Sequence, residues 1–467
     1  MKNWSKHRIG VSGLVFISSV VGCYAQSVNS NDKPNIVIVL ADDLGWGDVG
    51  YHGSSIKTPN IDKLSQTAIQ LNRFYVAPIS SPTRTGLMTG KYPNRLGIRE
   101  VVIPPWRDYG IEPEEIMLPQ ELAKAGYENR AIIGKWHLGH SKKKYYPLNK
   151  GFTHFYGCLN GAIDYFTHER EGELDWHNDW ESCYDKGYST DLITEEAVKC
   201  IKEYSKEGPF FIYVAYNAPH TPLQANDDDL KLYGFDESKP RYGKVKTGHG
   251  NNEEQTFSAM VTCLDRGVGK IIQALKDAGE FDNTFFLFLS DNGTENGSSG
   301  ELRGKKFLEF DGGVRSPALL SWPSEVKGRQ VISQLMGYVD VMPTLLDIAG
   351  QESIAAFDGM SMLSVLTGKE KSIDRKLYLG LGTAVTNEWK FIEKDHNPKI
   401  KLDKDQLFRI DSDVSEKYNI IEQYPKIAID LKTFVNRDDT IKPIRRLPDY
   451  DEGRDGFVAP KEWKILE

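Results

Sequence analysis

Ser80, Pro82 and Arg84 are spaced two apart in the segment Ser80-Ser-Pro82-Thr-Arg84, a pattern that could build an anion site. Proline is favoured in the first turn of a helix, where its missing N–H costs nothing, so we expect Ser80 just before a helix N-terminus. Such ends carry unpaired N–H groups and partial positive charge, which suit an anion. Arg84 would add a guanidinium that can bind sulfate or phosphate with two hydrogen bonds. Alone, the pattern is more typical of a capping serine beside a surface arginine, and it is the other motifs of the chain that favour an anion site.

Hard oxygen ligands occur in two short clusters. Asp42 and Asp43 follow one apolar run, and Asp291 and Asn292 follow another. Carboxylate and amide oxygens suit Ca²⁺ or Mg²⁺ better than a softer transition metal. Each pair alone is typical of a turn at the end of a strand, but two such pairs after two apolar runs favour a metal site.

Cationic and histidine side chains complete the candidate chemistry. Lys135 and His137 lie two residues apart after a glycine, so in an extended segment they would share one face. His220 lies in Ala-Pro-His-Thr-Pro, where two prolines stiffen the loop and make the histidine a candidate general acid. Lys306 follows a glycine that allows close backbone approach. These four residues could hold an anion and move protons around it.

The polar clusters follow apolar runs of strand length. The runs do not alternate with polar residues and are rich in β-formers, which is typical of strands buried on both faces. Helical stretches are expected at 119–125, 190–203 and 256–278, and alternating strands and helices predict a mostly parallel sheet covered on both faces. In such sheets ligands bind at the carboxyl ends of the strands, so distant clusters can meet in one site. The four runs are 35–41, 131–133, 209–215 and 285–289.

The pattern changes after about residue 365. Short strands are expected at 376–381, 389–393 and 406–411, with turn residues between them. We therefore predict a catalytic domain over 33–365. A smaller subdomain over 366–467 would hold an antiparallel sheet and a terminal helix.

Composition excludes several classes of protein. The 467 residues are 39% hydrophobic and 27% charged, with a formal net charge of −8, so nonspecific attraction to nucleic acid is not expected. Residues 1–25 have the basic start and short apolar run of a signal peptide, and no later segment is long and apolar enough to span a membrane. We expect a periplasmic or secreted protein, with Cys23 as a possible lipid anchor. Four later cysteines could be buried thiols or form disulfides, for example Cys158 with Cys183.

Taken together, the motifs resemble those of the type I, formylglycine-dependent sulfatases. The likeness runs from about residue 33 to the end, and it implies a large, mixed, mostly parallel α/β sheet of the alkaline-phosphatase-like fold. The matching segments are Leu-Ala-Asp-Asp-Leu-Gly-Trp-Gly-Asp (40–48), Ser-x-Pro-x-Arg (80–84), Gly-Lys-Trp-His-Leu-Gly (134–139), Ala-Pro-His (218–220), Ser-Asp-Asn-Gly (290–293), Arg-Gly-x-Lys (303–306), Asp-Val-Met-Pro-Thr-Leu (340–345) and Phe-Asp-Gly-Met-Ser (357–361).

This resemblance implies a role for each candidate residue. Ser80 would be oxidised to Cα-formylglycine, whose hydrate attacks the sulfur of a sulfate ester, and His137 would then help to expel the sulfate. Arg84 and Lys135 would stabilise the hydrate, while Lys306 and His220 would hold the sulfate and His220 would protonate the leaving oxygen. One Ca²⁺ would be bound by Asp42, Asp43, Asp291, Asn292 and the modified residue 80.

Position 80 holds serine where many members of the family have cysteine, so modification would require an anaerobic sulfatase-maturating enzyme acting before export. Asp311 stands where glutamate is commoner. Residues 151–200 resemble the arylsulfatase B, or N-acetylgalactosamine-4-sulfatase, branch. The resemblance implies a sulfated oligosaccharide with galactose- or N-acetylgalactosamine-type O-sulfate, with a lean to the 4-O position. Candidate sugar contacts are Asp164, His168, Glu169, Arg170, Trp106 and Trp180.

Two other functions fit some of these features. A phosphodiesterase or phosphonate hydrolase of the same superfold would prefer phosphate to sulfate esters. A non-catalytic protein that binds sulfated glycans would keep Ser80 unmodified and release no sulfate. A serine hydrolase fits less well, because Ser80 does not lie in a Gly-x-Ser-x-Gly turn.

Overall fold

The computed structural model describes Met1 and residues 33–465, apart from residues 100, 244–246, 327, 353–355 and 444. Apart from Met1, the predicted signal peptide and Cys23 lie outside the described residues. Among the helices that are described, none is both long and apolar enough to cross a lipid bilayer. The four later cysteines carry free thiols, so Cys158 and Cys183 are not joined.

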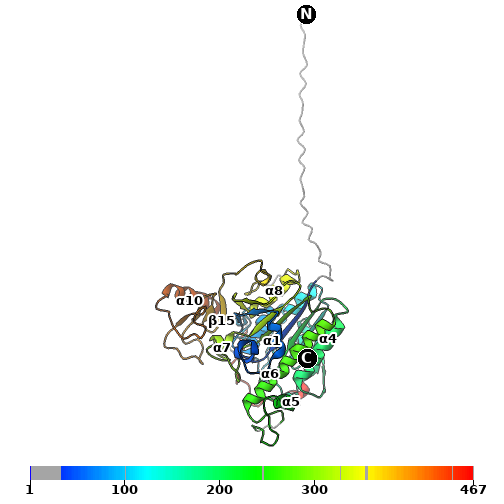
Figure 1. The fold of residues 1–467 in the computed structure, drawn as a ribbon. Coiled ribbons are helices and arrows are strands. Elements are labelled where there is room, and N and C mark those ends of the chain that lie inside the picture. Colours follow the sequence, from blue (N-terminus) through cyan, green and yellow to red (C-terminus); the bar gives the residue numbers. More distant parts are fainter. Residues whose placement is uncertain are drawn as a thin grey trace.

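A ten-stranded sheet forms the centre of the molecule (Figure 1). The five strands from β11 to β5 run parallel, whereas β12, β2 and β8 each pair antiparallel with a neighbour. In spatial order the strands are β13 (Gln330–Ile332), β2 (Ile69–Leu71), β12 (Ala318–Ser321), β11 (Thr284–Ser290), β1 (Asn35–Ala41), β10 (Phe210–Ala215), β4 (Asn129–Gly134), β5 (His154–Gly157), β8 (His177–Asn178) and β9 (Glu181–Ser182).

Both faces of this sheet are covered by helices. Alternate residues of β1 enter different hydrophobic cores: Ile36 and Ile38 pack on one face, and Val37 and Val39 on the other. This explains why the apolar run does not alternate with polar residues. One core includes α1 (Pro59–Ser65), α4 (Ser189–Tyr204), α5 (Asp227–Lys231) and α6 (Glu253–Asp277), and the other includes α2 (Ser80–Thr89), α3 (Leu118–Lys124), α8 (Val341–Ile348) and α9 (Leu363–Leu366).

A small antiparallel sheet follows in the C-terminal part of the chain. Helix α10 (Pro425–Asp439) packs on one face of it through Leu431 and Val435, while Leu377 and Phe408 of the sheet join the main core. The strands are β15 (Leu377–Gly380), β16 (Thr383–Val385), β17 (Trp389–Ile392) and β18 (Gln406–Arg409). The predicted fold class is therefore confirmed.

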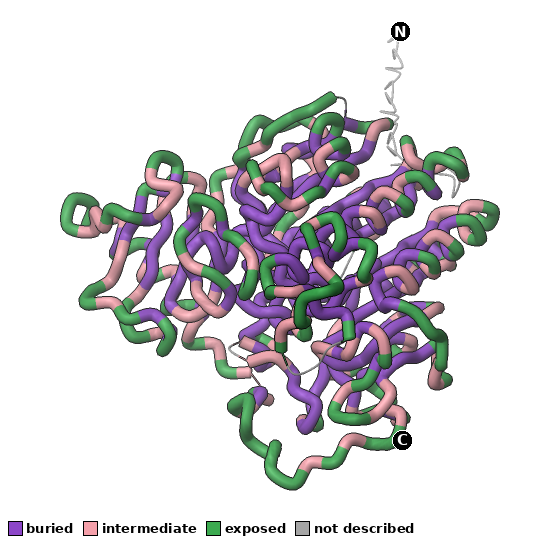
Figure 2. The backbone as a smooth tube through the Cα atoms, turned by 60° about the horizontal axis from the view of Figure 1, so that its bottom comes forward, coloured by how far each residue is buried: buried purple, intermediate pink, exposed green. Residues whose placement is uncertain are grey.

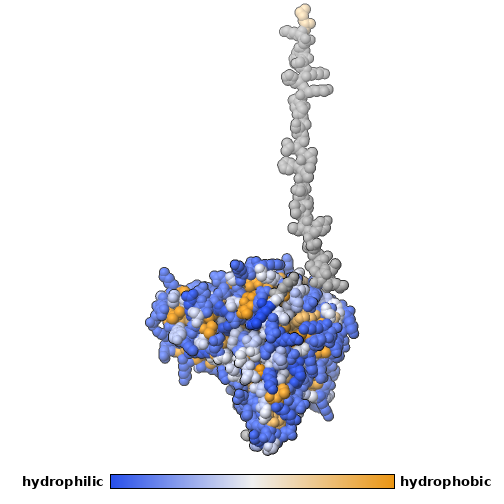
Figure 3. Space-filling view, viewed as in Figure 1, coloured by the Kyte–Doolittle hydropathy of each residue, from blue (hydrophilic) through white to orange (hydrophobic). Residues whose placement is uncertain are grey.

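Short elements complete the fold. Strands β3 (Phe74–Tyr75) and β14 (Met336–Gly337) pair with each other, as do β6 (Glu169–Arg170) and β7 (Glu173–Leu174), and α7 (Asp311–Val314) is a single turn. The backbone is buried through the centre and exposed at the margins (Figure 2). The face drawn in Figure 3 is mostly hydrophilic, with small separate apolar patches that are usual on a surface in contact with water.

Candidate active site

The predicted catalytic and metal-binding residues meet at the carboxyl ends of the central parallel strands. Asp42 and Asp43 follow β1, Asp291 and Asn292 follow β11, and Lys135 follows β4. The carboxyl ends are brought together by register, since Ala41 pairs with Ser290 and Ala215 pairs with Gly134. Residues separated by up to 264 positions in the sequence therefore form one cluster, which also contains Ser80, Arg84, His137, His220 and Lys306.

Helix α2 begins at Ser80 itself, whereas Ser80 was expected to be the last residue before the helix. Ile79 is the extended residue at that position. The Ser80 hydroxyl donates to Asp291 Oδ2 (2.6 Å) and accepts from Arg84 Nε (2.9 Å). His137 Nδ1 lies 3.3 Å from the same oxygen. The Ser80 side chain is therefore surrounded by an acceptor, a donor and a histidine that can be either.

Three cations balance the carboxylates of the cluster. Arg84 Nη2 donates to Asp291 Oδ2 (2.8 Å), and its Nη1 donates to the carbonyl of Lys135 (3.1 Å). Lys135 Nζ donates to Asp42 Oδ2 (2.5 Å). Lys306 Nζ donates to Asp43 Oδ2 (2.7 Å). All three cations are buried, so these ion pairs are weakly screened by solvent.

Two oxygens in the cluster accept no hydrogen bond. They are Asp42 Oδ1 and Asn292 Oδ1, and both residues are fully buried. Burial and the neighbouring Asp291 raise the pKa of Asp42 to about 8. Burial would also raise the pKa of Asp291, but Arg84 and Lys135 lower it overall. Crowded carboxylates with unpaired oxygens are the donor set that a hard cation would complete.

Both histidines are held neutral by their surroundings. Burial, and then the nearby Lys135 and Arg84, lower the pKa of His137 well below its ordinary value. Burial, and then Lys306, lower the pKa of His220 to about 3. His220 Nδ1 lies 2.6 Å from the carbonyl of Thr221, so Nδ1 carries the hydrogen and Nε2 is left facing Asp43 Oδ2 at 3.8 Å.

Two site residues have left-handed backbone conformations. Asp43 has φ 67° and His137 has φ 57°, values that residues with a Cβ adopt rarely. The segment from Lys135 to His137 is therefore not uniformly extended, as the sequence argument assumed. Hydrogen bonds from Lys135 N–H to the Ala215 carbonyl and from His137 N–H to the Leu159 carbonyl fix it instead.

Sequence reasoning missed two residues that position His137. The Ser81 hydroxyl donates to the His137 carbonyl (3.0 Å) and accepts from the Ile103 N–H (3.2 Å). Gly161 lies against the imidazole, because a Cβ built there would be 2.4 Å from His137 Cε1 and Nε2. Ser81 could have been suspected from its place beside Ser80, but no local pattern marks Gly161.

The structure separates the predicted sugar contacts into two groups. His140 Nε2 lies 2.8 Å from the Pro105 carbonyl, so the Trp106 segment packs against the loop that follows His137. Trp106 is buried, and its indole donates to the Tyr450 carbonyl. The carbonyl of Arg170 accepts from Trp463, whose ring packs edge-on against His140 at 5.3 Å. These contacts join the Trp106 segment, Arg170 and Trp463 around His140.

The other candidates have different surroundings. Asp164 closes a turn by accepting from the N–H groups of Phe166 and Thr167, and His168 is buried against Trp176. Glu169 is exposed in β6. Trp180 is 43% exposed and stacks on Tyr146. Strand β8 runs antiparallel to β5, with Tyr156 paired to Asn178, so the turn that holds Trp180 lies beside the start of β5. The cluster lies at the opposite, carboxyl ends of the parallel strands, so the structure does not bring Trp180 to it.

Comparison with known proteins finds relatives of this chain. A family model described as "Sulfatase" matches residues 34–351. Arylsulfatase J of Mus musculus is 35% identical over 330 residues, which cover 68% of this chain and only 52% of that protein. N-acetylgalactosamine-6-sulfatase of Homo sapiens is 34% identical over 375 residues, which cover 74% of this chain and 68% of that protein.

The crystal structure of Ps i-CgsB in complex with k-i-k-neocarrahexaose is also similar. Its TM-score is 0.78 and its identity is 30%, with 90% of this chain and 96% of that chain covered. The sulfatase yidJ of Bacteroides fragilis, described as putative, has a TM-score of 0.69 at 26% identity, covering 90% of this chain and 98% of that chain. These matches include arylsulfatases and 6-sulfatases, so they do not single out the arylsulfatase B branch.

Proposed function

The chain belongs to the sulfatase family, and we propose that it is an exported carbohydrate sulfatase that hydrolyses O-sulfate esters and releases inorganic sulfate. One observation carries this proposal. Ser80 Oγ lies within hydrogen-bond distance of Arg84, His137 and Asp291, beside two buried oxygens that accept no hydrogen bond. A transferred sulfuryl group is anionic, and such a site supplies cations where charge develops in the transition state.

One Ca²⁺ would be held by Asp42, Asp43, Asp291 and Asn292. The Oδ1 atoms of Asp42 and Asn292 support this assignment, because each is buried and accepts no hydrogen bond; Arg84 Nη2 lies 3.9 Å from Asp42 Oδ1, too far to donate to it. When bound, the ion would supply a Lewis acid for the sulfate oxygens. Lys135 and Lys306 each neutralise one of the aspartates from outside the ligand set, on Asp42 and Asp43 respectively.

Ser80 would be converted to formylglycine by an anaerobic sulfatase-maturating enzyme. Its surroundings suit two hydroxyl groups, since they include a donor on Arg84, an acceptor on Asp291 and the adaptable His137. When formed, the group would supply a hydrated aldehyde as the nucleophile. An aldehyde hydrate can release sulfate by elimination, whereas a sulfate ester of unmodified serine cannot.

The residues of this chain would position and move the protons. Neutral His137 can accept a proton at Nδ1 from a hydroxyl at position 80. Lys306 would hold a sulfate oxygen. His220 would carry at Nε2 the proton that reaches the leaving oxygen, since its Nδ1 is engaged by Thr221. The lowered pKa of His220 makes it neutral in the free protein, and an anionic ester beside it would favour protonation.

We propose galactose- or N-acetylgalactosamine-type sugars as the substrates, with a preference for the 4-O sulfate. The sugar class is supported by the similarity to an N-acetylgalactosamine-6-sulfatase and to a structure that binds k-i-k-neocarrahexaose. The preference for the 4-O position is based on the resemblance of residues 151–200 to the N-acetylgalactosamine-4-sulfatase branch. The 6-O ester is the alternative, because an N-acetylgalactosamine-6-sulfatase is among the similar proteins. Arg170, whose side chain is partly exposed, would contact the sugar, while the buried Trp463 would hold its backbone in place.

The first test is the mass of the tryptic peptide Phe74–Arg84 from protein coexpressed with the maturating enzyme. Loss of two hydrogens, with an aldehyde trapped at Ser80, is the expected result. The matured protein is then assayed for sulfate release from matched 4-O- and 6-O-sulfated N-acetylgalactosamine disaccharides. Ser80→Ala is the control, because it keeps the surrounding cations and cannot be modified.

Each alternative function has its own outcome. Release of phosphate from diesters, faster than release of sulfate, would favour the phosphodiesterase. An unmodified Ser80 together with tight binding of the sulfated disaccharide and no turnover would favour the glycan-binding protein. Turnover of the 6-O ester alone would keep the sulfatase and overturn the 4-O preference.

A further inference from the structure

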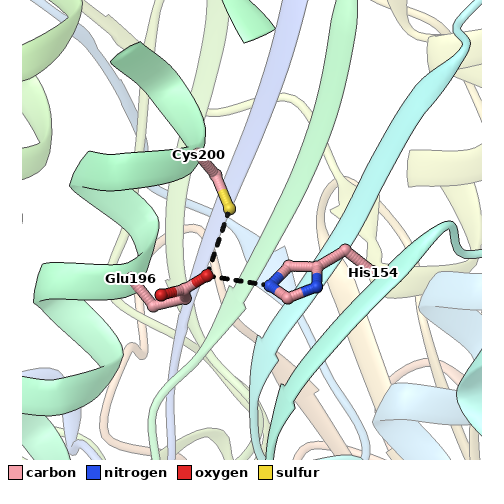
Figure 4. A group of neighbouring side chains, drawn as sticks. All are labelled: His154, Glu196 and Cys200. Carbon is pink, nitrogen blue, oxygen red and sulfur yellow. Dashed lines mark hydrogen bonds and ion pairs between the residues drawn. The ribbon is translucent and has the colours of Figure 1, made fainter. Parts of the chain in front are cut away.

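A second cluster of metal-ligating side chains lies away from the catalytic edge. His154 is the first residue of β5, whereas the candidate active site lies at the opposite, carboxyl ends of the parallel strands. Glu196 and Cys200 are one turn apart on α4, so they face the same side of that helix. Figure 4 shows all three side chains converging between the helix and the sheet.

The three ligand atoms are spaced as a small metal ion requires. His154 Nε2 lies 2.9 Å from Glu196 Oε1, and Cys200 Sγ lies 3.9 Å from the same oxygen. All three atoms lie within 4.8 Å of one another. Bonds of about 2.0 Å to nitrogen and about 2.3 Å to sulfur, at tetrahedral angles, separate ligand atoms by roughly 3.5 Å. Small side-chain shifts would therefore admit an ion.

Asp179 orients the histidine. Its Oδ1 lies 3.0 Å from His154 Nδ1, and the same oxygen accepts from the Phe155 N–H at 2.9 Å. One ring hydrogen is held at Nδ1 by Asp179, and Nε2 donates the other to Glu196; a bound ion would replace the Nε2 hydrogen and take its lone pair. A carboxylate behind a histidine in this way is the usual arrangement around histidine-bound zinc.

The cluster can be reached from solvent, although its sulfur is buried. The side chains of His154 and Glu196 are 16% and 11% exposed, and Cys200 is 2% exposed with a free thiol. Lys199 Nζ now lies 3.0 Å from Glu196 Oε1, but that lysine is 55% exposed and can turn into water. A divalent ion would replace the lysine as the partner of the carboxylate.

We propose that His154, Glu196 and Cys200 form a Zn²⁺ site, with Asp179 as the positioning residue. Imidazole, carboxylate and thiolate together suit zinc, while the all-oxygen cluster around Asp42 suits Ca²⁺. Three protein ligands leave a fourth tetrahedral position for water. The proposal does not depend on the modification of Ser80 or on sulfatase activity.

The test uses the purified full chain with excess Ca²⁺ present, so that the oxygen-rich site is filled. Co²⁺ is titrated as a spectroscopic probe, and Zn²⁺ is then added as a competitor. We expect one cobalt ion per chain, a thiolate-to-cobalt charge-transfer band in the near ultraviolet, and loss of the band when zinc displaces cobalt. Absence of the band in the wild-type protein would overturn the proposal.

Four variants locate the site. Cys200→Ser should abolish the band, and Glu196→Gln should weaken zinc binding. Asp179→Asn, at a half-exposed residue that should not disturb folding, is expected to weaken zinc binding by about 10- to 100-fold. Cys263→Ser is the matched control, since it removes a buried thiol of α6 and should leave the band unchanged. A band that survives Cys200→Ser, or zinc affinity unchanged in Asp179→Asn, would place the ion elsewhere.

Discussion

At the scale of single residues, the unpaired Oδ1 of Asn292 predicts a specific effect on metal binding. In Asn292→Ala we expect at least a tenfold loss of Ca²⁺ affinity, because even residues that only orient metal ligands contribute about that much. Calorimetric titration of metal-depleted protein measures the affinity. Activity at saturating Ca²⁺ should largely recover, and a variant that binds Ca²⁺ as tightly as the wild type would argue against Asn292 as a ligand.

Gly161 provides a second residue-scale prediction, because a methyl group there would collide with the His137 ring. Gly161→Ala should lower kcat by about 100-fold, the cost of displacing a catalytic group by about 1 Å. Sulfate release from the matured enzyme measures the effect. Gly126→Ala is the control: Gly126 has φ 86° with open space around it, so that variant should lose about 1–2 kcal/mol of stability and keep its kcat. Equal kcat in both variants would contradict the prediction.

Glu309 predicts how stability depends on pH. Burial raises the pKa of Glu309 from 4.5 to about 7, although Asn397 donates to its carboxylate. The folded state then holds a proton that the unfolded chain releases above pH 4.5, so this residue stabilises the fold at low pH. That contribution, up to roughly 3 kcal/mol, is lost as pH rises through about 7.

Glu309→Gln should therefore flatten the fall in stability between about pH 4.5 and pH 7. Urea unfolding at several pH values measures this. Glu301→Gln, at an exposed residue, should leave the slope unchanged. A slope that is the same in the wild type and in Glu309→Gln would show that other groups cause it.

How much of the site can be predicted from sequence depends on where each signal lies. Asp42, Asp291 and Lys135 directly follow strands with strong patterns, so their convergence follows from the rule for parallel sheets. Gly161 could not be predicted, because its role depends on the distance to a ring 24 residues away in the sequence. The unpaired oxygens of Asp42 and Asn292 likewise depend on side-chain packing that no local pattern encodes.

At the scale of elements, buried ion pairs join the small sheet to the site. Lys390 of β17 lies 2.7 Å from Asp311 Oδ1 in α7 and 2.8 Å from Glu416 Oε1, and all three side chains are fully buried. Lys390→Met would leave Glu416 without a cation and Asp311 with Arg315 alone, 3.5 Å away. We expect a loss of about 3–5 kcal/mol in the free energy of unfolding, measured with urea.

The control for this prediction lies on the same sheet. Lys376 is 35% exposed, and its partner Asp430 is 62% exposed, so Lys376→Met should cost at most about 1 kcal/mol. Adding Asp311→Asn and Glu416→Gln to Lys390→Met should recover part of the loss. Equal small effects for the two lysine variants would mean that the buried pairs do not hold the sheet in place.

Elements were predictable where their sequence pattern was strong. The run 35–41 coincides with β1, and the stretch 190–203 lies within α4, Ser189–Tyr204. Strand β16 was missed, since its three residues form a strand only between two partners. Strands β2, β12 and β13, at one side of the large sheet, were missed for the same reason, because their pairing depends on contacts far along the chain.

At the scale of the whole molecule, the C-terminal segment returns from the small sheet to the large one, where it packs against Arg170 and His140. The Leu447 N–H donates to the Gly97 carbonyl, and the Trp463 indole donates to the Arg170 carbonyl. The tube that leads to the C-terminus in Figure 2 is mostly exposed, yet Trp463 is only 1% exposed against His140. This segment therefore supports Arg170 and His140 from the C-terminal part of the chain.

The position of Trp463 predicts that substrates of different size respond differently to its loss. In Trp463→Ala we expect KM for a sulfated disaccharide to rise roughly tenfold, equivalent to about 1.4 kcal/mol, because Arg170 and the Trp106 segment lose their support. The rate with a small aryl sulfate, which needs only the cluster around Ser80, should change little.

The Trp463→Ala variant should also lose about 3–5 kcal/mol of stability, so the assays should be run well below its melting temperature. Val458→Ala, at an 84% exposed residue of the same segment, should affect neither substrate. Equal losses on both substrates would mean that Trp463 supports the catalytic cluster itself rather than residues that contact the sugar.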